Sequence, residues 1–255
     1  KTLFKSIIIV LIILSKIINI YIIMFVLFDM NYKIPSPKEI REKYQKSEYS
    51  FIEYHFHRRI SPYFTWFFLH VTLTAELIAL LTPLTDLLTL FLIYRGNFIL
   101  AAIFTQIHII LDSSDGEIAR FRKTLVKRSK KEEAWGAFTD SLVGMILFPF
   151  VVFYTALILG DLITASIAIG AFYLLVITSA YTKVYYPGSK VGKNFREKML
   201  GKRKYKWGFN SIIQKSLITL TLLFQAIIFL WIFVAGALAI TLLRIRLLYK
   251  QNNKD

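Results

Sequence analysis

Long apolar runs separated by short basic segments are the feature that most constrains the fold of this chain. A helix needs about 20 predominantly apolar residues to cross the roughly 30 Å of hydrocarbon in a bilayer, and six runs reach or approach that length. These runs are Leu73–Tyr94, Phe98–Ile118, Ala137–Leu159, Leu162–Tyr181, Phe209–Leu223 and Ala226–Leu247. The sequence therefore predicts an all-α integral membrane protein built as a six-helix transmembrane bundle.

A further apolar run, Leu3–Phe28, precedes this bundle. Lys5 and Lys16 interrupt it, and a cation at the middle of a span costs about 2.5–3.5 kcal/mol unless it faces protein. The run has no cleavage site of small residues, so a signal peptide that is removed is not expected. Two interpretations stay open for residues 1–29: an extra transmembrane helix, or an over-long start ahead of Met30.

Residues 30–60 mix cations with aromatic and branched apolar side chains. The cations of this segment include Lys38, Arg41, Lys43, Lys46, Arg58 and Arg59. This mixture predicts a helix in the cytoplasmic membrane interface, with its aromatic rings among the headgroups and its cations toward anionic lipid. An ordinary solvated cap is the alternative. The six-span domain then covers residues 61–250, and residues 251–255 form a tail.

The net charge of +16, from 32 Lys and Arg against 16 Asp and Glu, indicates topology more than a nucleic-acid surface. Most cations lie between the apolar runs, in Arg120–Lys131 and Lys183–Lys206 among others, whereas Gly160-Asp161 and the turn near Gln225 carry none. The positive-inside rule places both ends of the bundle and both large loops in the cytoplasm. We therefore expect a multi-pass protein of the cell membrane, with any chemistry of these loops facing cytosolic solutes and no nucleic-acid partner.

A pair of carboxylates lies at the end of the second of these six runs. Asp112 and Asp115 are three residues apart, which places their side chains on one helix face about 5–6 Å from each other. Two carboxylates that close repel unless a cation lies between them, and oxygen ligands suit Mg²⁺, Mn²⁺ or Ca²⁺. Glu117 follows about 200° further round the helix and is expected to face away from the pair.

Small residues and a third carboxylate accompany the pair. Gly116 and Ala119 leave room beside it for a ligand or for a neighbouring helix. Asp140 lies at the start of the next span, four residues after Gly136. A short cytoplasmic loop joins the two spans, so we expect antiparallel neighbours that bring Asp140 to the same metal. The absence of Cys excludes disulfides and Cys-ligated metals.

The pattern resembles the signature of the CDP-alcohol phosphotransferase (phosphatidyltransferase) family, D-x-x-D-G-x-x-A-R followed by a spacer and G-x-x-x-D-x-x-x-D. The residues that match are Asp112, Asp115, Gly116, Ala119, Arg120, Gly136 and Asp140. With the six-helix topology, the resemblance covers about Arg59 to Leu247. It implies a metal-dependent membrane enzyme that transfers a phosphate-linked alcohol from a CDP-activated lipid to a hydroxyl or polyol-phosphate acceptor, releasing CMP, in phospholipid synthesis.

The resemblance also implies roles for the matching residues. Asp112, Asp115 and Asp140 would ligate Mg²⁺ or Mn²⁺, which neutralises a diphosphate and stabilises the attacking and leaving oxygens. The nucleotide would lie against Gly116, Ala119, Arg120 and Gly136. A homodimer is a further implication of the resemblance alone.

One position departs from the family signature at a catalytic residue. The last aspartate of the signature, which is a second-metal ligand and the expected general base, is Gly144 in this chain. Loss of a general base typically costs 10²–10⁴-fold in rate. The alternative function is therefore a non-catalytic family member that binds CDP-lipid or metal and serves as a binding or assembly protein in the membrane.

Two further groups of residues are candidates for the site. His108 precedes Asp112 by one helical turn, so it either orients that carboxylate through a hydrogen bond or is hydrogen-bonded inside the bundle. The second basic loop either recruits an anionic acceptor or lipid, or only sets topology. The candidate residues of that loop are Lys183, Lys190, Lys193 and Arg196.

Overall fold

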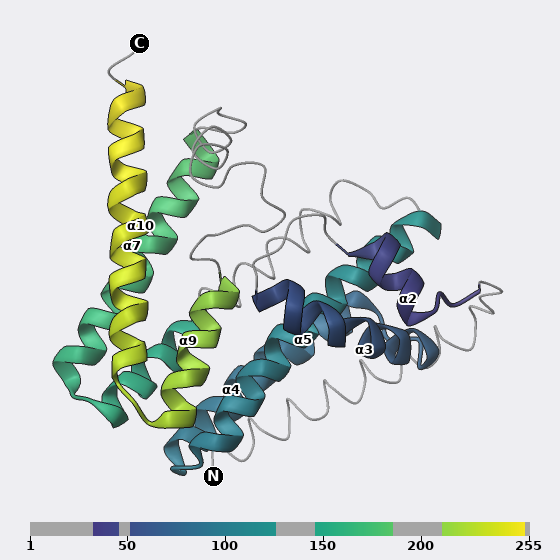
Figure 1. Cartoon of the computed structure of the whole chain (residues 1–255), viewed down its shortest axis with the longest axis horizontal. Helices are drawn as coiled ribbons and strands as arrows, with labels where there is room; N and C mark the ends of the chain where they lie inside the picture. Colours follow the sequence, from purple (N-terminus) through teal and green to yellow (C-terminus); the bar gives the residue numbers. More distant parts are fainter. Residues whose placement is uncertain (1–32, 46–51, 126–145, 186–210, 253–255) are drawn as a thin grey trace, which may run out of the picture.

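The computed structural model describes residues 33–45, 52–125, 146–185 and 211–252, and all regular structure within these ranges is helical. In chain order the elements are α2 (Pro37–Glu39), the π-helical turns η1 (Ile40–Tyr44) and η2 (Glu53–His57), α3 (Arg58–His70), α4 (Ala75–Tyr94), α5 (Phe98–Leu125), the helix Ile146–Leu159, α7 (Leu162–Tyr185), α9 (Ser211–Phe224) and α10 (Ile228–Asn252) (Figure 1).

Four helices of the described residues are long and apolar enough to cross a membrane. They are Ala75–Tyr94, Phe98–Leu125, Leu162–Tyr181 and Ile228–Arg246. Two shorter apolar helices, Ile146–Leu159 and Ser211–Phe224, each begin directly after an undescribed segment. The chain is thus an all-α protein that fits an integral membrane protein. The bundle of six spans stays a prediction, and the run expected to be an extra span or an over-long start, residues 1–29, lies outside the described residues.

The outward faces of these helices are apolar. Leu80, Leu84, Leu87 and Phe91 follow one face of α4, and each is between 46% and 55% exposed. A continuous apolar surface of this kind is rare on a protein surrounded by water. Acyl chains of a bilayer would cover it at no cost, which agrees with the expected membrane location.

Three tight turns lie at one end of the molecule (Figure 1). They join α4 to α5 at residues 95–97, the helix Ile146–Leu159 to α7 at residues 160–161, and α9 to α10 at residues 225–227. Gly96, with φ at +71°, makes the turn between α4 and α5, a conformation that glycine adopts without strain. Gly160 lies so close to the turn between α9 and α10 that a Cβ on it would be 2.7 Å from Ile227 Cδ1. Residues that flank all three turns, such as Ala101, Ala156 and Leu230, share one buried apolar cluster.

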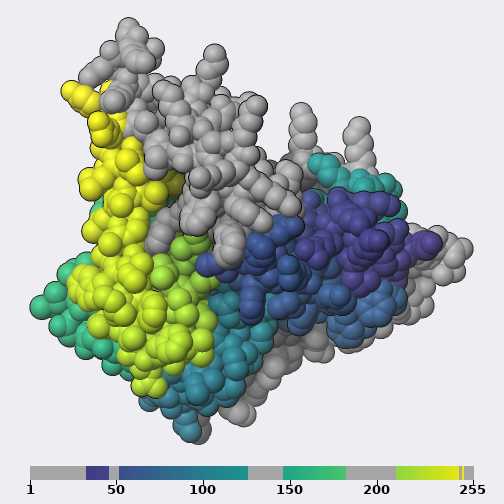
Figure 2. All heavy atoms as spheres, viewed as in Figure 1, coloured from purple at the N-terminus to yellow at the C-terminus, as the bar shows by residue number. Residues whose placement is uncertain are grey.

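The elements before α4 pack on the opposite part of α5. Helix α3 is amphipathic, because its buried residues recur at helical spacing and include Ser61, Thr65, Phe68 and Leu69. Its apolar residues share a second cluster with Ile40 of η1 and with residues of α4 and α5. Figure 2 shows these N-terminal elements as one continuous surface at their end of the molecule.

The expected interfacial helix of residues 30–60 has a different local structure where it is described. It consists of the short elements α2, η1 and η2, and helix α3 begins at Arg58 and passes residue 60 to end at His70. The exposed side of α3 carries aromatic rings, among them Tyr63, Trp66 and Phe67. Aromatic side chains are typical of the membrane–water interface, so the interfacial prediction extends to α3.

Candidate functional site

Helix α5 carries the predicted carboxylate pair inside one long, uninterrupted element of 28 residues. At about 1.5 Å per residue, Asp112 lies about 21 Å along the helix axis from Phe98, where the tight turn ends. The pair is therefore far from the end of the molecule that the three turns share. This position suits a site near the opposite membrane surface.

The two faces of α5 differ as the spacing predicts. Asp112 is exposed and Asp115 is half-buried, whereas Glu117 is completely buried on the side of α3. The carboxylates of Asp112 and Asp115 both interact electrostatically with the ammonium group of Lys215 on α9. Helices α5 and α9 are in contact, so the structure adds a cation from a distant part of the sequence to the predicted acidic pair.

Lys215 belongs to a buried cluster of three ionisable side chains from three helices. Asp86 of α4 and His108 of α5 are each 3% exposed, and Lys215 is 8% exposed. Asp86 Oδ1 lies 2.7 Å from His108 Nδ1. On the other side of the ring, His108 Nε2 is hydrogen-bonded to Lys215 Nζ. His108 is thus held inside the bundle, and it lies near enough to Asp112 for an electrostatic interaction.

The chemistry of the three groups fixes how their protons are shared. An ammonium group only donates hydrogen bonds, so His108 Nε2 accepts from Lys215 and the imidazole carries its proton on Nδ1, toward Asp86. A carboxylate, a neutral ring and an ammonium sum to zero charge. Moving a proton from Lys215 to His108 leaves that sum unchanged. The three groups are therefore neutral as a whole, although the ammonium group of Lys215 also attracts Asp112 and Asp115.

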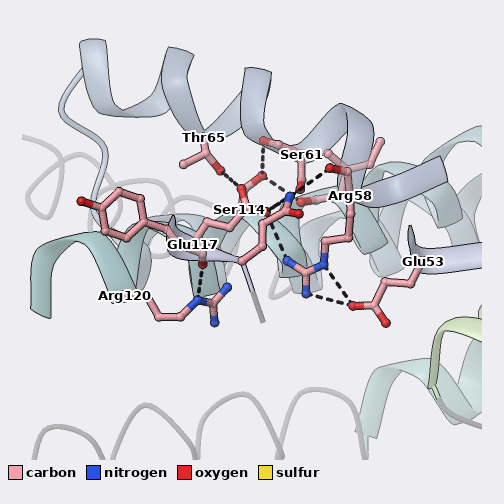
Figure 3. A network of polar contacts seen from close by, with 10 residues as sticks. Glu53, Arg58, Ser61, Thr65, Ser114, Glu117 and Arg120 are labelled. Carbon is pink, nitrogen blue, oxygen red and sulfur yellow. Dashed lines mark hydrogen bonds and ion pairs between the residues drawn. The ribbon is translucent and has the colours of Figure 1, made fainter. Parts of the chain in front are cut away.

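Glu117 is the centre of a second buried network, which ties the N-terminal elements to α5 (Figure 3). Its Oε1 accepts from Ser61 Oγ at 2.6 Å and from an Arg58 N–H at 3.2 Å, and its Oε2 accepts from Thr65 Oγ1 at 2.6 Å. Gln45 donates to the same carboxylate at 3.0 Å. Arg58 also donates to Glu53 through two of its nitrogens. Glu117 accepts four hydrogen bonds, one of them from the guanidinium of Arg58, so burial of this carboxylate is tolerated.

Of the residues expected to lie against a nucleotide, Gly116, Ala119 and Arg120 are on the same part of α5 as Glu117. The guanidinium of Arg120 lies over Gly116, where a Cβ would be 3.2 Å from one of its terminal nitrogens. Arg120 Nε donates to the backbone carbonyl of Tyr44 in η1. Ala119 packs against the apolar cluster below α3. Gly116 therefore provides room for the Arg120 side chain, which links η1 to the acidic turn of α5.

Several candidate residues lie outside the described part of the chain. They are Gly136, Asp140, Gly144, Lys190, Lys193 and Arg196, and of Lys183 only the backbone is described, at the end of α7. Within the described residues no three acidic, His or Cys side chains form a group that could hold a metal. The described donors are the carboxylates of Asp112 and Asp115, whose oxygens suit one Mg²⁺ or Mn²⁺ ion.

Asp86 and Lys215 were missed by the sequence analysis, although a signal for both is present. Each interrupts an apolar helix, and ionisable residues inside such helices usually face the protein interior and have a function. A further indication would have been that both residues contact His108. Its contact to Lys215 spans 107 residues of sequence, which periodicity cannot foresee.

No protein-family model matches the sequence, and no curated protein gives a significant match. The resemblance to CDP-alcohol phosphotransferases therefore rests on the residues of its motif.

Proposed function

We propose that this protein transfers a phosphate-linked alcohol of the phosphatidyl type from a CDP-activated donor to a hydroxyl acceptor, with release of CMP. The observation that carries the proposal is the motif from Asp112 to Arg120, which lies unbroken on one apolar helix with Asp112 exposed and Asp115 half-buried. We also propose that this site faces the cytoplasm from the cell membrane, as the distribution of basic residues favours.

The chemistry of the donor explains the residues at the site. A CDP-linked lipid carries two negative charges on its diphosphate, and a divalent cation bound by Asp112, Asp115 and Asp140 would neutralise them at the reacting phosphorus. The role of the protein is then to hold carboxylates at a fixed position. Glu117 contributes to this, because its network prevents rotation of the helix turn that carries the pair.

The acceptor in this proposal is a hydroxyl compound, and a polyol phosphate is favoured. The support is the basic composition of the loop that contains Lys183, Lys190, Lys193 and Arg196. Cations bind phosphate through charge-assisted hydrogen bonds, so a phosphorylated acceptor would be held there near the membrane surface. Neutral polyols are the contrasting members of an acceptor panel.

The test is release of CMP from a CDP-lipid by purified protein in lipid nanodiscs, with Mg²⁺ or Mn²⁺ and a panel of acceptors. We expect Asp112→Asn to lower the rate at least about 100-fold, because a metal ligand would be lost. Glu42→Gln is the matched control, since Glu42 is an exposed carboxylate of η1, and should keep the wild-type rate. No CMP release by the wild type with any acceptor would refute the proposal.

Gly144 is the specific observation that favours a second function, a binding protein without catalysis. Gly144→Asp separates the two functions. In a weakened enzyme this variant would restore the missing base and raise turnover, by about 10²–10⁴-fold if the base is fully restored. In a binding protein it would leave CMP release at background while CDP-lipid still binds.

A further inference from the structure

The position of Lys215 is not explained by membrane insertion or by helix packing. A lysine inside an apolar helix is costly, and Lys215 lies on a helix that buries it among Asp86, His108 and Phe148. Apolar side chains would fill this space without that cost. Its link through His108 to Asp86 offsets part of this cost, and a bound anion would offset more of it.

The contacts of Lys215 hold its ammonium in one place. His108 accepts one of its hydrogens, and the ring of His108 is in turn fixed by Asp86 at 2.7 Å. The ring of Phe148 lies 5.6 Å from Nζ. An ammonium has three donors, so two remain for groups other than His108. Its position is therefore set by the α4–α5 pair and not by its own flexible chain.

The carboxylates that interact with Lys215 are those of the predicted metal site. Asp112 and Asp115 belong to α5, one and two turns beyond His108, and both attract the ammonium. In the family that this chain resembles, Gly144 would be an aspartate that binds a second metal ion. The chain thus lacks this anionic ligand, because Gly144 stands at its position, and it has a buried cation, Lys215, near the acidic pair.

We propose that Lys215, anchored through His108 to Asp86, provides the second positive charge of the site and binds the diphosphate of the CDP-linked donor beside a single divalent ion. This inference rests on the proposed function and deepens it, since it assigns a substrate-binding residue. No proton or electron is transferred by Lys215 in this role. The site then needs one metal ion instead of two.

The proposal predicts changes of opposite sign in two binding constants. Lys215→Met removes the charge and keeps a long side chain. The ammonium repels a divalent ion and attracts a diphosphate, so the variant should bind Mn²⁺ about tenfold more tightly and CDP about tenfold more weakly. Electron paramagnetic resonance of free Mn²⁺ gives the affinity and the number of ions, and equilibrium dialysis with labelled CDP in saturating Mg²⁺ gives the second constant.

Asp86→Asn is the matched variant, because it removes a negative charge from the same cluster where Lys215→Met removes a positive one. It keeps the shape of the Asp86 side chain and removes its negative charge, so Mn²⁺ should bind more weakly and CDP more tightly than in the wild type. Lys215→Arg keeps the charge and should shift neither constant in the direction of Lys215→Met. If Lys215→Met does not fold, as judged by gel filtration and circular dichroism, Asp86→Asn carries the test alone.

The outcomes separate this inference from the proposed function. One Mn²⁺ per chain in the wild type and opposite shifts in the variants support it. Two Mn²⁺ per chain, unchanged constants, or a parallel loss of both affinities in a folded variant would overturn it while leaving the proposed function in place. A wild-type protein that binds neither Mn²⁺ nor CDP would refute the proposed function, and this inference with it.

Discussion

Glu117 is a carboxylate whose role depends on residues far away in the sequence. Spacing along α5 places it opposite Asp115, but its donors Arg58, Ser61 and Thr65 precede it by 59, 56 and 52 residues. A sequence pattern gives the direction of a side chain on its own helix and says nothing of what lies there. For the same physical reason the acidic pair was predictable, and its neighbour Lys215 was not.

We expect Glu117→Ala to destabilise the protein by about 3–5 kcal/mol, because it removes the partner of buried donors and of Arg58. Thermal melting in detergent, followed by tryptophan fluorescence, measures the effect. Glu42→Ala replaces an exposed carboxylate and should change the free energy of unfolding by no more than about 0.5 kcal/mol. Equal melting temperatures of the two variants would show that the network contributes little.

His57 predicts a dependence of stability on pH. It is 1% exposed, and burial lowers its pKa below the usual 6.5, against a hydrogen bond to Gln106 and the charge of Glu53 that raise it; the charge of Arg58 lowers it further. The unfolded chain therefore binds a proton near pH 6.5 that the folded chain binds only at lower pH. Stability contributed by this residue is complete above pH 6.5 and decreases as the pH falls below it.

The expected slope from His57 is at most about 1.4 kcal/mol per pH unit below pH 6.5, and none above it. Melting temperatures between pH 5 and pH 8 give the profile. His57→Gln should flatten its acidic part, whereas His70→Gln, at an exposed position, should leave it as in the wild type. A profile that His57→Gln does not change would assign the acid sensitivity to other groups.

At the scale of elements, turn residues made the helix ends predictable. The predicted and observed helices share their ends at Tyr94, Phe98 and Leu162, beside Arg95-Gly96-Asn97 and Gly160-Asp161. The helix that contains the second predicted span continues past Ile118 to Leu125, through residues that include no Gly or Pro. Hydrophobicity marks where a helix leaves the membrane and does not mark where the helix itself ends.

Gly160 offers a test of how the turns pack. A Cβ at this position would lie 2.7 Å from Ile227 Cδ1 and 2.9 Å from the carbonyl oxygen of Ala156, so Gly160→Ala should cost about 1–3 kcal/mol. Gly170→Ala, in α7, meets no atom within 4 Å and should cost nothing. Thermal melting of the two variants measures these costs. A Gly160→Ala protein as stable as the wild type would mean that the turn at Gly160 is not in contact with the turn between α9 and α10.

At the scale of the whole molecule, the three turns lie at one end, which predicts that they are on the same side of the membrane. Positions 97, 161 and 225 are exposed, and the sequence contains no Cys, so single cysteines can be introduced without removing others. We expect Asn97→Cys, Asp161→Cys and Gln225→Cys to react with a membrane-impermeant maleimide on intact cells. Lys38→Cys, in α2 near the opposite end of the bundle, should react only after permeabilisation. Different labelling among the three turn positions would contradict the shared end.

The bonds between Glu117 and α3 have a consequence for where the proposed reaction takes place. Helix α3 carries aromatic rings on its exposed side, and Glu117, which is bonded to α3, is two residues from Asp115 on α5. If α3 lies in the headgroup layer, as the sequence predicts for this part of the chain, its depth in the lipid sets the height of the acidic pair above the bilayer centre. A donor dissolved in the membrane and an acceptor dissolved in water can react only at a depth that both reach. The position of α3 in the lipid would therefore decide whether the acidic pair lies at that depth.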